Sequence, residues 1–238
     1  MIRFICVVIF ILSFGLFMLP MLIYIDHISK KDAHKGARIA QKHVSRAFKF
    51  IMWFCRVKVK VEGLENIPTD QPVLYASNHR GAFDILAGYT TVPTSTGFVA
   101  KKEVAKIPVI STWMRRMNCL FLDRENPREG LKSILQGIEN IKAGFSMFIM
   151  PEGTRNHGEG LLPFKEGSFK MAEKTGCPII PVAIEGTDAR FENQFPRIKP
   201  GNISIKYGKP IYPAQLSKEE KKKLEEMVRG VVQEMLDN

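Results

Sequence analysis

The segment PVLYASNHRGAFD, residues 72–84, changes character near its middle. Its first six residues form a short apolar run, which is typical of a buried β-strand. The residues that follow are polar or small, and Gly81 makes a tight turn easy. A strand that ends in a polar turn and leads into a helix is the repeating unit of α/β proteins.

Five other short apolar runs accompany this one, at residues 96–100, 119–122, 146–150, 179–184 and 203–207. Residues 57–61 instead alternate valine with lysine, which predicts a further strand with one solvated face. Between two of the apolar runs, residues 128–143 repeat apolar side chains at helical spacing. This alternation predicts an α/β fold with a largely parallel (mixed) sheet flanked by helices. We expect it to form one domain over residues 51–238.

A last helix is predicted to begin at Ser217, which fits a capping box with Glu220. The lysine cluster at residues 218–223 is most simply a solvated face of this helix. Apolar residues at helical spacing predict one buried face, formed by Leu224, Met227, Val228, Val231 and Met235.

The 238 residues carry a formal net charge of +11, from 35 basic and 24 acidic side chains. With 45% hydrophobic and 25% charged residues, the composition excludes a disordered chain and a polytopic membrane protein. The four cysteines include no Cys-x-x-Cys pair, which excludes a disulfide framework and a zinc cluster and suits a reducing compartment. The charge indicates a phosphate-rich partner, but the sequence lacks the motifs of nucleic-acid recognition.

The first 50 residues are predicted to bind a membrane. Residues 4–25 carry no charge, and about 20 apolar residues in a helix cross a bilayer core of ~30 Å. We favour a retained anchor over a cleaved signal peptide, because no small-residue cleavage site follows the run. Pro20 leaves open a kinked helix that enters the bilayer and returns, so insertion is the firmer expectation.

Basic residues follow this run and place more than half of the excess charge within residues 1–50. By the positive-inside tendency, the rest of the chain lies on the cytoplasmic face of the (inner) membrane. One helical arc gathers Lys35, Arg38, Lys42, Arg46 and Lys49, and the opposite arc gathers Ala40, Val44, Ala47, Phe48 and Ile51. We favour a helix lying in an anionic headgroup layer over an ordinary amphipathic helix packed on the domain.

Candidate catalytic residues follow the strand at residues 72–77, because ligands of open α/β sheets bind at the carboxyl ends of strands. His79 can take a proton near neutral pH, and Asp84 can hold its other ring nitrogen. Positions five apart on one helix point about 140° apart, so His79 must lie in the turn before the helix. Taken alone, His-x4-Asp is more simply a capped surface turn.

Candidate phosphate-binding residues follow other strands. Gly153 allows close backbone approach to an anion, Thr154 offers a hydroxyl, and Arg155 presents a fork suited to phosphate. Glu152 would orient Arg155 or accept from a substrate hydroxyl. Two more cations, Lys101 and Arg124, follow the runs at residues 96–100 and 119–122.

Other chemistries find no support in the sequence. Ser168 lacks the Gly-x-Ser-x-Gly pattern of a nucleophilic serine, and the cysteines lie in apolar surroundings. The chain contains no P-loop and no dinucleotide fingerprint. We therefore expect no cofactor, no metal and no covalent nucleophile.

Four ordered blocks carry a resemblance to a known family: Asn78-His79-x4-Asp84, Phe121-x-x-Arg124, Pro151-Glu152-Gly153-Thr154-Arg155 and Ile180-Pro181-Val182. Over roughly residues 60–190 the chain resembles the glycerolipid acyltransferases, and most of all the bacterial 1-acyl-sn-glycerol-3-phosphate acyltransferases. The N-terminal segment is similar to their membrane-binding portion. Met150 and Asn156 depart from the family pattern, which commonly has Phe and Ser there.

The resemblance implies transfer of a fatty acyl group from an acyl carrier protein or coenzyme A thioester to the sn-2 hydroxyl of lysophosphatidic acid, giving phosphatidic acid in phospholipid biosynthesis. It implies His79 as general base oriented by Asp84, without a covalent acyl-enzyme. The acceptor phosphate would meet Lys101, Arg124 and Arg155. The alternatives are another lysolipid acceptor, a thioesterase, and a non-catalytic membrane lipid-binding protein.

Overall fold

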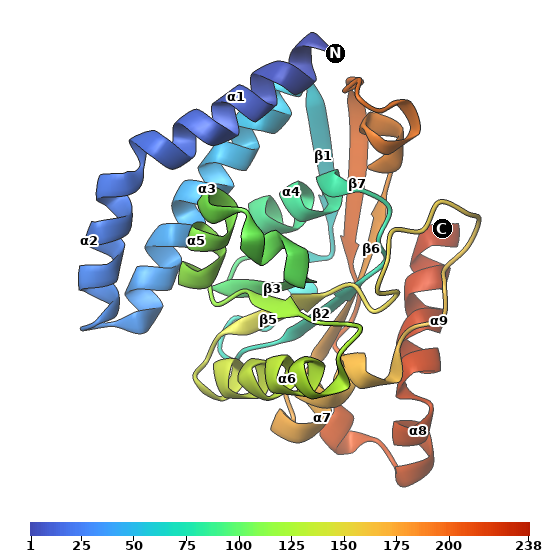
Figure 1. The fold of residues 1–238 in the computed structure, drawn as a ribbon. Coiled ribbons are helices and arrows are strands. Elements are labelled where there is room, and N and C mark those ends of the chain that lie inside the picture. Colours follow the sequence, from blue (N-terminus) through green and yellow to red (C-terminus); the bar gives the residue numbers. More distant parts are fainter.

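A single seven-stranded sheet forms the centre of the molecule (Figure 1). The computed structural model describes residues 1–238, apart from the side chain of Glu166. The strands lie in the order β1-β7-β6-β2-β5-β3-β4. They are β1 (Val57–Glu62), β2 (Leu74–Ser77), β3 (Thr96–Lys101), β4 (Leu120–Leu122), β5 (Ser146–Ile149), β6 (Ile179–Glu185) and β7 (Gly201–Tyr207). All seven predicted strands are therefore confirmed.

The strands run in two directions. β6, β2, β5, β3 and β4 are parallel to one another, β7 is antiparallel to β6, and β1 is parallel to β7. This confirms the largely parallel, mixed sheet. The carboxyl ends of five strands thus meet at one edge of the sheet. Because β7 returns beside β6, the segment at residues 186–200 that joins them lies at the same edge.

Helices cover both faces of the sheet (Figure 1). One face carries α3, α4 and α5, with α1 and α2 outside them, and the other carries α6, α7 and α9. The helices are α1 (Ile2–Phe17), α2 (Leu19–Ser29), α3 (Ala33–Cys55), α4 (Ala82–Thr91), α5 (Pro108–Arg116), α6 (Pro127–Lys142), α7 (Lys170–Thr175), α8 (Lys218–Lys222) and α9 (Leu224–Asp237).

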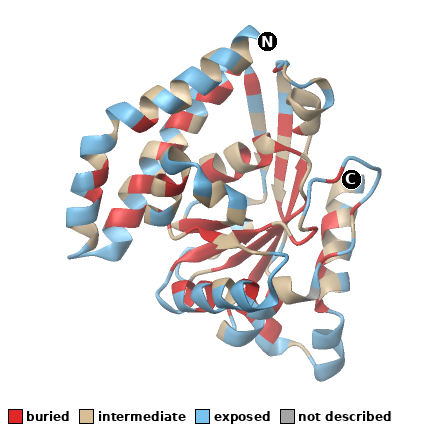
Figure 2. Ribbon diagram, viewed as in Figure 1, coloured by how far each residue is buried: buried red, intermediate tan, exposed pale blue. Residues whose placement is uncertain are grey.

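The two-residue period of the strands divides the core between these faces. In β2, Tyr75 points to the α4 side, whereas Leu74 and Ala76 point to the α6 side. Tyr75 stacks on Phe148 of β5 with ring centroids 5.6 Å apart, and Phe148 stacks on Phe98 of β3 at 4.4 Å. Figure 2 shows the central strands β2, β5 and β6 as the most continuously buried part of the chain. The edge that carries the polar turns is thus held by a rigid central layer.

The apolar run at residues 4–25 is broken at Met18, and Pro20 lies in the first turn of α2. Within the described chain no single helix is long and apolar enough to cross a bilayer. α1 and α2 reach that length only together, as a pair bent by 54°. Proline lacks the N–H that would continue the hydrogen-bond ladder, which accounts for a break at this place.

The favoured interpretation of α3, with its apolar face in lipid, is wrong. Ala40, Val44, Ala47 and Ile51 are buried, because this face packs against α4 and the inner sides of α1 and α2. The alternative, an amphipathic helix packed on the domain, is the observed one. α3 also runs across the predicted boundary between residues 50 and 51. The opposite arc of α3 forms a basic stripe whose five cations are all exposed: Lys35, Arg38, Lys42, Arg46 and Lys49.

The predicted C-terminal helix is two helices, α8 and α9, separated at Lys223. The capping box is confirmed, since Ser217 Oγ accepts from Glu220 N and Glu220 Oε2 accepts from Ser217 N. The buried face of α9 consists of Leu224, Val228 and Val232. Of the predicted face, Leu224 and Val228 are buried, whereas Met227, Val231 and Met235 are only partly buried. The buried positions recur every four residues along α9, which brings in Val232.

Candidate active site

The turn between β2 and α4 places His79 at the carboxyl edge of the sheet. Asn78 is fully buried and pins the end of β2 to β6: its side chain donates to Ile184 O and accepts from Ile184 N, both at 2.8 Å. α4 begins at Ala82, with Gly81 as its N-cap. His79 therefore lies in the turn before the helix, as the spacing predicts.

The structure brings His79 and Asp84 together, with His79 Nδ1 2.7 Å from Asp84 Oδ2. The same carboxylate oxygen accepts from the backbone N–H groups of Arg80 and Gly81, each at 2.8 Å. Asp84 is fully buried in the first turn of α4, where the helix dipole favours a negative charge. If Nδ1 donates its proton to Asp84, Nε2 remains as the acceptor nitrogen of the imidazole. The His79 side chain is 18% exposed, so a ligand can reach it.

Glu152 holds the backbone of this turn from the neighbouring strand. Its side chain is buried, Oε1 accepts from His79 N at 2.8 Å, and Oε2 accepts from Leu162 N at 3.0 Å. Glu152 does not orient Arg155, whose acidic neighbour is Glu192 at 3.5 Å. Each oxygen of Glu152 accepts from a backbone N–H group, so the observed part of this side chain is to hold the turn. Its contact with a substrate hydroxyl stays a prediction.

The loop after β5 gathers the predicted arginines. Arg124 donates to the carbonyl oxygen of Gly153. Gly153 has φ +73°, and a Cβ there would lie 2.7 Å from Lys165 Cε, so only glycine fits comfortably. Thr154 and Arg155 are exposed beside it. Lys165 is thus a further cation at this loop, which the sequence reasoning missed.

Lys101 lies exposed at the end of β3, in register with Leu122, two residues before Arg124. Its neighbour Lys102 is engaged with acidic side chains, at 3.0 Å from both Asp123 Oδ1 and Glu125 Oε2. The predicted cations therefore share one edge of the sheet.

A second residue that sequence reasoning missed is Glu192, from the segment between β6 and β7. Its Oε1 accepts from Ala82 N at 2.8 Å and lies 3.5 Å from Arg155 Nη1. Nothing in the local pattern of residues 186–200 marks this glutamate. Only the reversal of direction between β6 and β7, which returns the segment to the carboxyl edge, could have suggested it.

A small apolar pocket of about 270 Å³ opens next to the loop after β5. Arg124, Gly153 and Lys165 contribute to its wall together with apolar side chains: Val99, Leu120, Leu122, Ile134, Ile149, Met150 and Met171. Pro151 and Gly153 of the pocket wall flank Glu152, and Glu152 accepts a hydrogen bond from His79 N. The pocket is therefore connected to the turn of His79 through this one residue.

Two of the four cysteines, Cys55 and Cys119, are poor nucleophiles. Burial raises the pKa of both Cys55 and Cys119 to about 11, so their thiols stay protonated at neutral pH. Within the described residues, no group of three or more His, Cys, Asp or Glu side chains is arranged to hold a metal ion.

Comparison with known proteins assigns a family to this arrangement. The family model described as Acyltransferase matches residues 58–185. This match is more than half of the chain and includes all four sequence blocks. The chain belongs to the acyltransferase family. This confirms the resemblance seen in the four sequence blocks.

The relatives of this chain share one activity in their names. This chain is 32% identical over 197 residues to a 1-acyl-sn-glycerol-3-phosphate acyltransferase of Borreliella burgdorferi. The match covers 79% of this chain and 76% of that protein. The chain is 37% identical over 159 residues to a chloroplastic protein of the same name from Brassica napus, covering 65% of this chain. The matched part makes up 45% of the plant protein, so the chain spans about half of that longer relative.

The fold of this acyltransferase is similar to a solved structure. The crystal structure of the 1-acyl-sn-glycerophosphate acyltransferase PlsC from Thermotoga maritima superimposes with a TM-score of 0.76 at 29% identity. The match covers 99% of this chain and 96% of that chain, so it includes the N-terminal helices as well as the sheet.

Replacement of Glu152 tests whether its two hydrogen bonds to backbone N–H groups stabilise the fold. Glu152→Gln presents an amide N–H₂ to one of two backbone donors, so we expect a loss of about 1–3 kcal/mol in the free energy of unfolding. Urea denaturation measures this loss. Glu159→Gln, on an exposed residue, is the control and should stay within about 0.5 kcal/mol of the parent protein. Equal stability of the two variants would contradict the bonding described for Glu152.

Proposed function

We propose that this chain transfers a fatty acyl group from a thioester to the free sn-2 hydroxyl of 1-acyl-sn-glycerol 3-phosphate. The observation that carries the proposal is the contact of His79 with the buried Asp84, beside a loop that bears Arg155 and accepts a hydrogen bond from Arg124. The names of the relatives support the same acceptor.

In the proposed mechanism, His79 Nε2 takes the proton of the acceptor hydroxyl. The hydroxyl oxygen attacks the thioester carbonyl carbon, and a tetrahedral intermediate forms. When the carbon–sulfur bond breaks, the departing sulfur receives the proton from His79. Asp84 stabilises the imidazolium between these steps, as its 2.7 Å contact with Nδ1 suggests. No covalent acyl-enzyme is needed.

Arg124 and Arg155 would bind the acceptor phosphate, since guanidinium groups match phosphate oxygens in charge and in geometry. Lys101 would add positive charge at the same edge, while Gly153 and Thr154 would shape the loop. Fixing the phosphate also fixes the sn-2 hydroxyl relative to His79. Such positioning contributes on the order of 7–11 kcal/mol at its ideal limit.

The thioester donor is either acyl carrier protein or coenzyme A. An assay that supplies both donors with lysophosphatidic acid separates them.

A lysolipid with a larger headgroup is the second candidate acceptor. A thioesterase would cleave the donor equally well without any lysolipid. A non-catalytic lipid-binding protein has no need of the buried charge on Asp84, which is costly unless it is paired.

The apolar pocket beside Arg124 would hold part of an acyl chain. Its volume of about 270 Å³ and its apolar walls suit a hydrocarbon segment. The depth of such a pocket would then limit chain length, since a chain that is too long leaves apolar surface in water.

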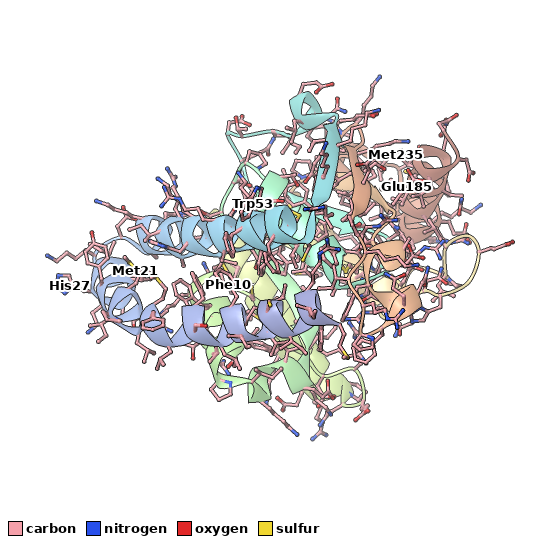
Figure 3. The ribbon with its side chains drawn as sticks, turned by 90° about the horizontal axis from the view of Figure 1, so that it is seen from above. Phe10, Met21, His27, Trp53, Glu185 and Met235 are labelled. Atoms are coloured by element: carbon pink, nitrogen blue, oxygen red, sulfur yellow. The ribbon has the colours of Figure 1, made fainter. Side chains whose placement is uncertain are left out.

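The N-terminal helices would hold the protein on the cytoplasmic face of an anionic membrane. α1 exposes an apolar outer face: Ile2, Ile5, Ile9, Leu12, Leu16 and Phe17 are 48–77% exposed. On α3, Trp53 is 72% exposed and falls in the same helical arc as the basic stripe. Figure 3 shows α1 and α3 side by side, with Phe10 and Trp53 labelled. α1 and α2 would insert into one leaflet, and the basic stripe would meet anionic headgroups.

His79→Ala tests the chemistry. We expect kcat for acyl transfer to fall about 10²- to 10⁴-fold, because the general base is removed. Release of free thiol from the donor, with and without lysophosphatidic acid, measures the rate. His27→Ala, on an exposed residue of α2, is the matched control and should keep the parent rate. Near-normal turnover of His79→Ala would refute the mechanism.

Ile134→Trp tests the acyl pocket. The larger side chain fills part of the cavity, so the preferred donor should become shorter by several methylene groups. Competition between donors of different chain length measures this preference. Leu131→Trp lies one turn earlier on α6 and is exposed, so it should leave the preference unchanged. An identical preference in both variants would exclude this pocket as the acyl site.

Neutralising the stripe tests membrane binding. Lys42→Gln with Arg46→Gln should weaken binding to vesicles containing anionic lipid about 30-fold, from about 1 kcal/mol per charge near the surface. Binding to neutral vesicles should change little. Lys221→Gln with Lys222→Gln on α8 is the control with equal loss of charge. Sedimentation with vesicles measures both pairs, and equal binding would count against the stripe.

A further inference from the structure

Glu192 is a buried carboxylate outside the four sequence blocks. Its side chain is 6% exposed, and its Oε1 accepts from Ala82 N at 2.8 Å. Among the described residues, Oε2 is buried without a hydrogen-bond partner. Burying a carboxylate with one unpartnered oxygen costs free energy unless neighbouring groups compensate it, which directs attention to the groups around Glu192.

Two carboxylates contact the turn that carries His79. Asp84 accepts from Gly81 N, while Glu192 lies where a side chain at position 81 would begin. A Cβ at position 81 would lie only 2.3 Å from Glu192 Oε2. The glycine therefore allows the carboxylate to approach the backbone, and the approach limits how far the turn can move.

Glu192 also reaches Arg155, the exposed arginine of the loop after β5. Oε1 lies 3.5 Å from Arg155 Nη1, on a guanidinium that has five N–H donors. One edge of the guanidinium faces Glu192, and the remaining donors stay available for another anion. Glu192 thus bridges the turn of His79 and the loop of Arg155.

We propose that Glu192 is a positioning residue of the acceptor site. It fixes the guanidinium of Arg155 relative to the first turn of α4, so that a phosphate held by Arg155 presents its neighbouring hydroxyl to His79. This inference rests on the proposed function. Glu192 also carries a charge that repels the phosphate, and the proposal requires the gain in orientation to exceed that repulsion.

The segment that carries Glu192 is in turn held by the first turn of α1. Phe4 stacks on Phe191 with centroids 5.4 Å apart and meets Phe195 edge-on at 5.7 Å. Arg3 Nη1 donates to Ile198 O at 3.4 Å. Figure 1 shows the N-terminal end of α1 and this segment at the same end of the sheet. The docking of α1 therefore fixes Glu192, which directly follows Phe191.

The test compares steady-state kinetics in mixed micelles, where acceptor and donor are varied separately. Glu192→Gln keeps the size of the side chain and an acceptor for Ala82 N, but it loses the attraction to Arg155. Glu192→Asp keeps the charge but is too short to reach. Both should raise the acceptor KM about fivefold and leave the donor KM unchanged. Glu226→Gln, on an exposed residue of α9, is the control.

A double-mutant cycle separates positioning from a merely structural effect. In an Arg155→Ala background, Glu192→Gln should change the acceptor KM less than twofold, because its partner is already absent. Additive effects, or an unchanged or lower acceptor KM in the single variants, would overturn the proposal. A parent enzyme that does not acylate lysophosphatidic acid at all would overturn the proposed function and this inference with it.

Phe4→Ala tests the support from α1 in the same assay. It should raise the acceptor KM in the direction of Glu192→Gln, whereas Leu135→Ala should not. Leu135 is 52% exposed on α6, so this control removes an apolar side chain without touching the segment or the outer face of α1. Equal acceptor KM values for the two variants would overturn the part assigned to α1.

Discussion

The carboxylate of Asp84 is the contact on which the arrangement of the site depends. It is fully buried, and one of its oxygens accepts from the imidazole of His79 and from two successive backbone N–H groups. A charge is tolerated there because these donors and the positive end of α4 surround it. The same bonds fix the turn, so that strand, turn and helix move as one body. β2, pinned to β6 through Asn78, brings this body to the edge of the sheet.

Acidic and basic groups have separate places in this basic chain. Asp84, Glu152 and Glu192 are buried, and each accepts from backbone N–H groups at or next to the turn. The arginines and lysines lie on the outside of the same edge, where Arg155 and Lys101 are exposed. The buried carboxylates thus shape the backbone, and the outer cations are left free to meet an anion from solution or from a bilayer.

Local features were predictable from the sequence, and features that depend on the surroundings were not. The seven strands, the turn at His79 and the cap at Ser217 depend on residues close together in the chain, and all three were confirmed. The apolar face of α3 has one pattern whether it meets lipid or protein, so its burial against α4 could not be read from that pattern. Glu152 was recognised as part of the site, but its direction is set by the N–H groups of His79 and Leu162. Glu192 is brought to the site only by the topology of the sheet.

The reversal of direction between β6 and β7 gives the site a border on a different connection from the turn of His79. Residues 186–200 leave and re-enter the sheet at the same edge, so their length and sequence can change without shifting the register of any strand. His79 and Asp84 belong to a different connection, and their hydrogen bond is touched by this segment only through the contact of Glu192 with the start of α4. The fold therefore offers a way for the surroundings of Arg155 to diverge between related proteins while the contact between His79 and Asp84 is kept.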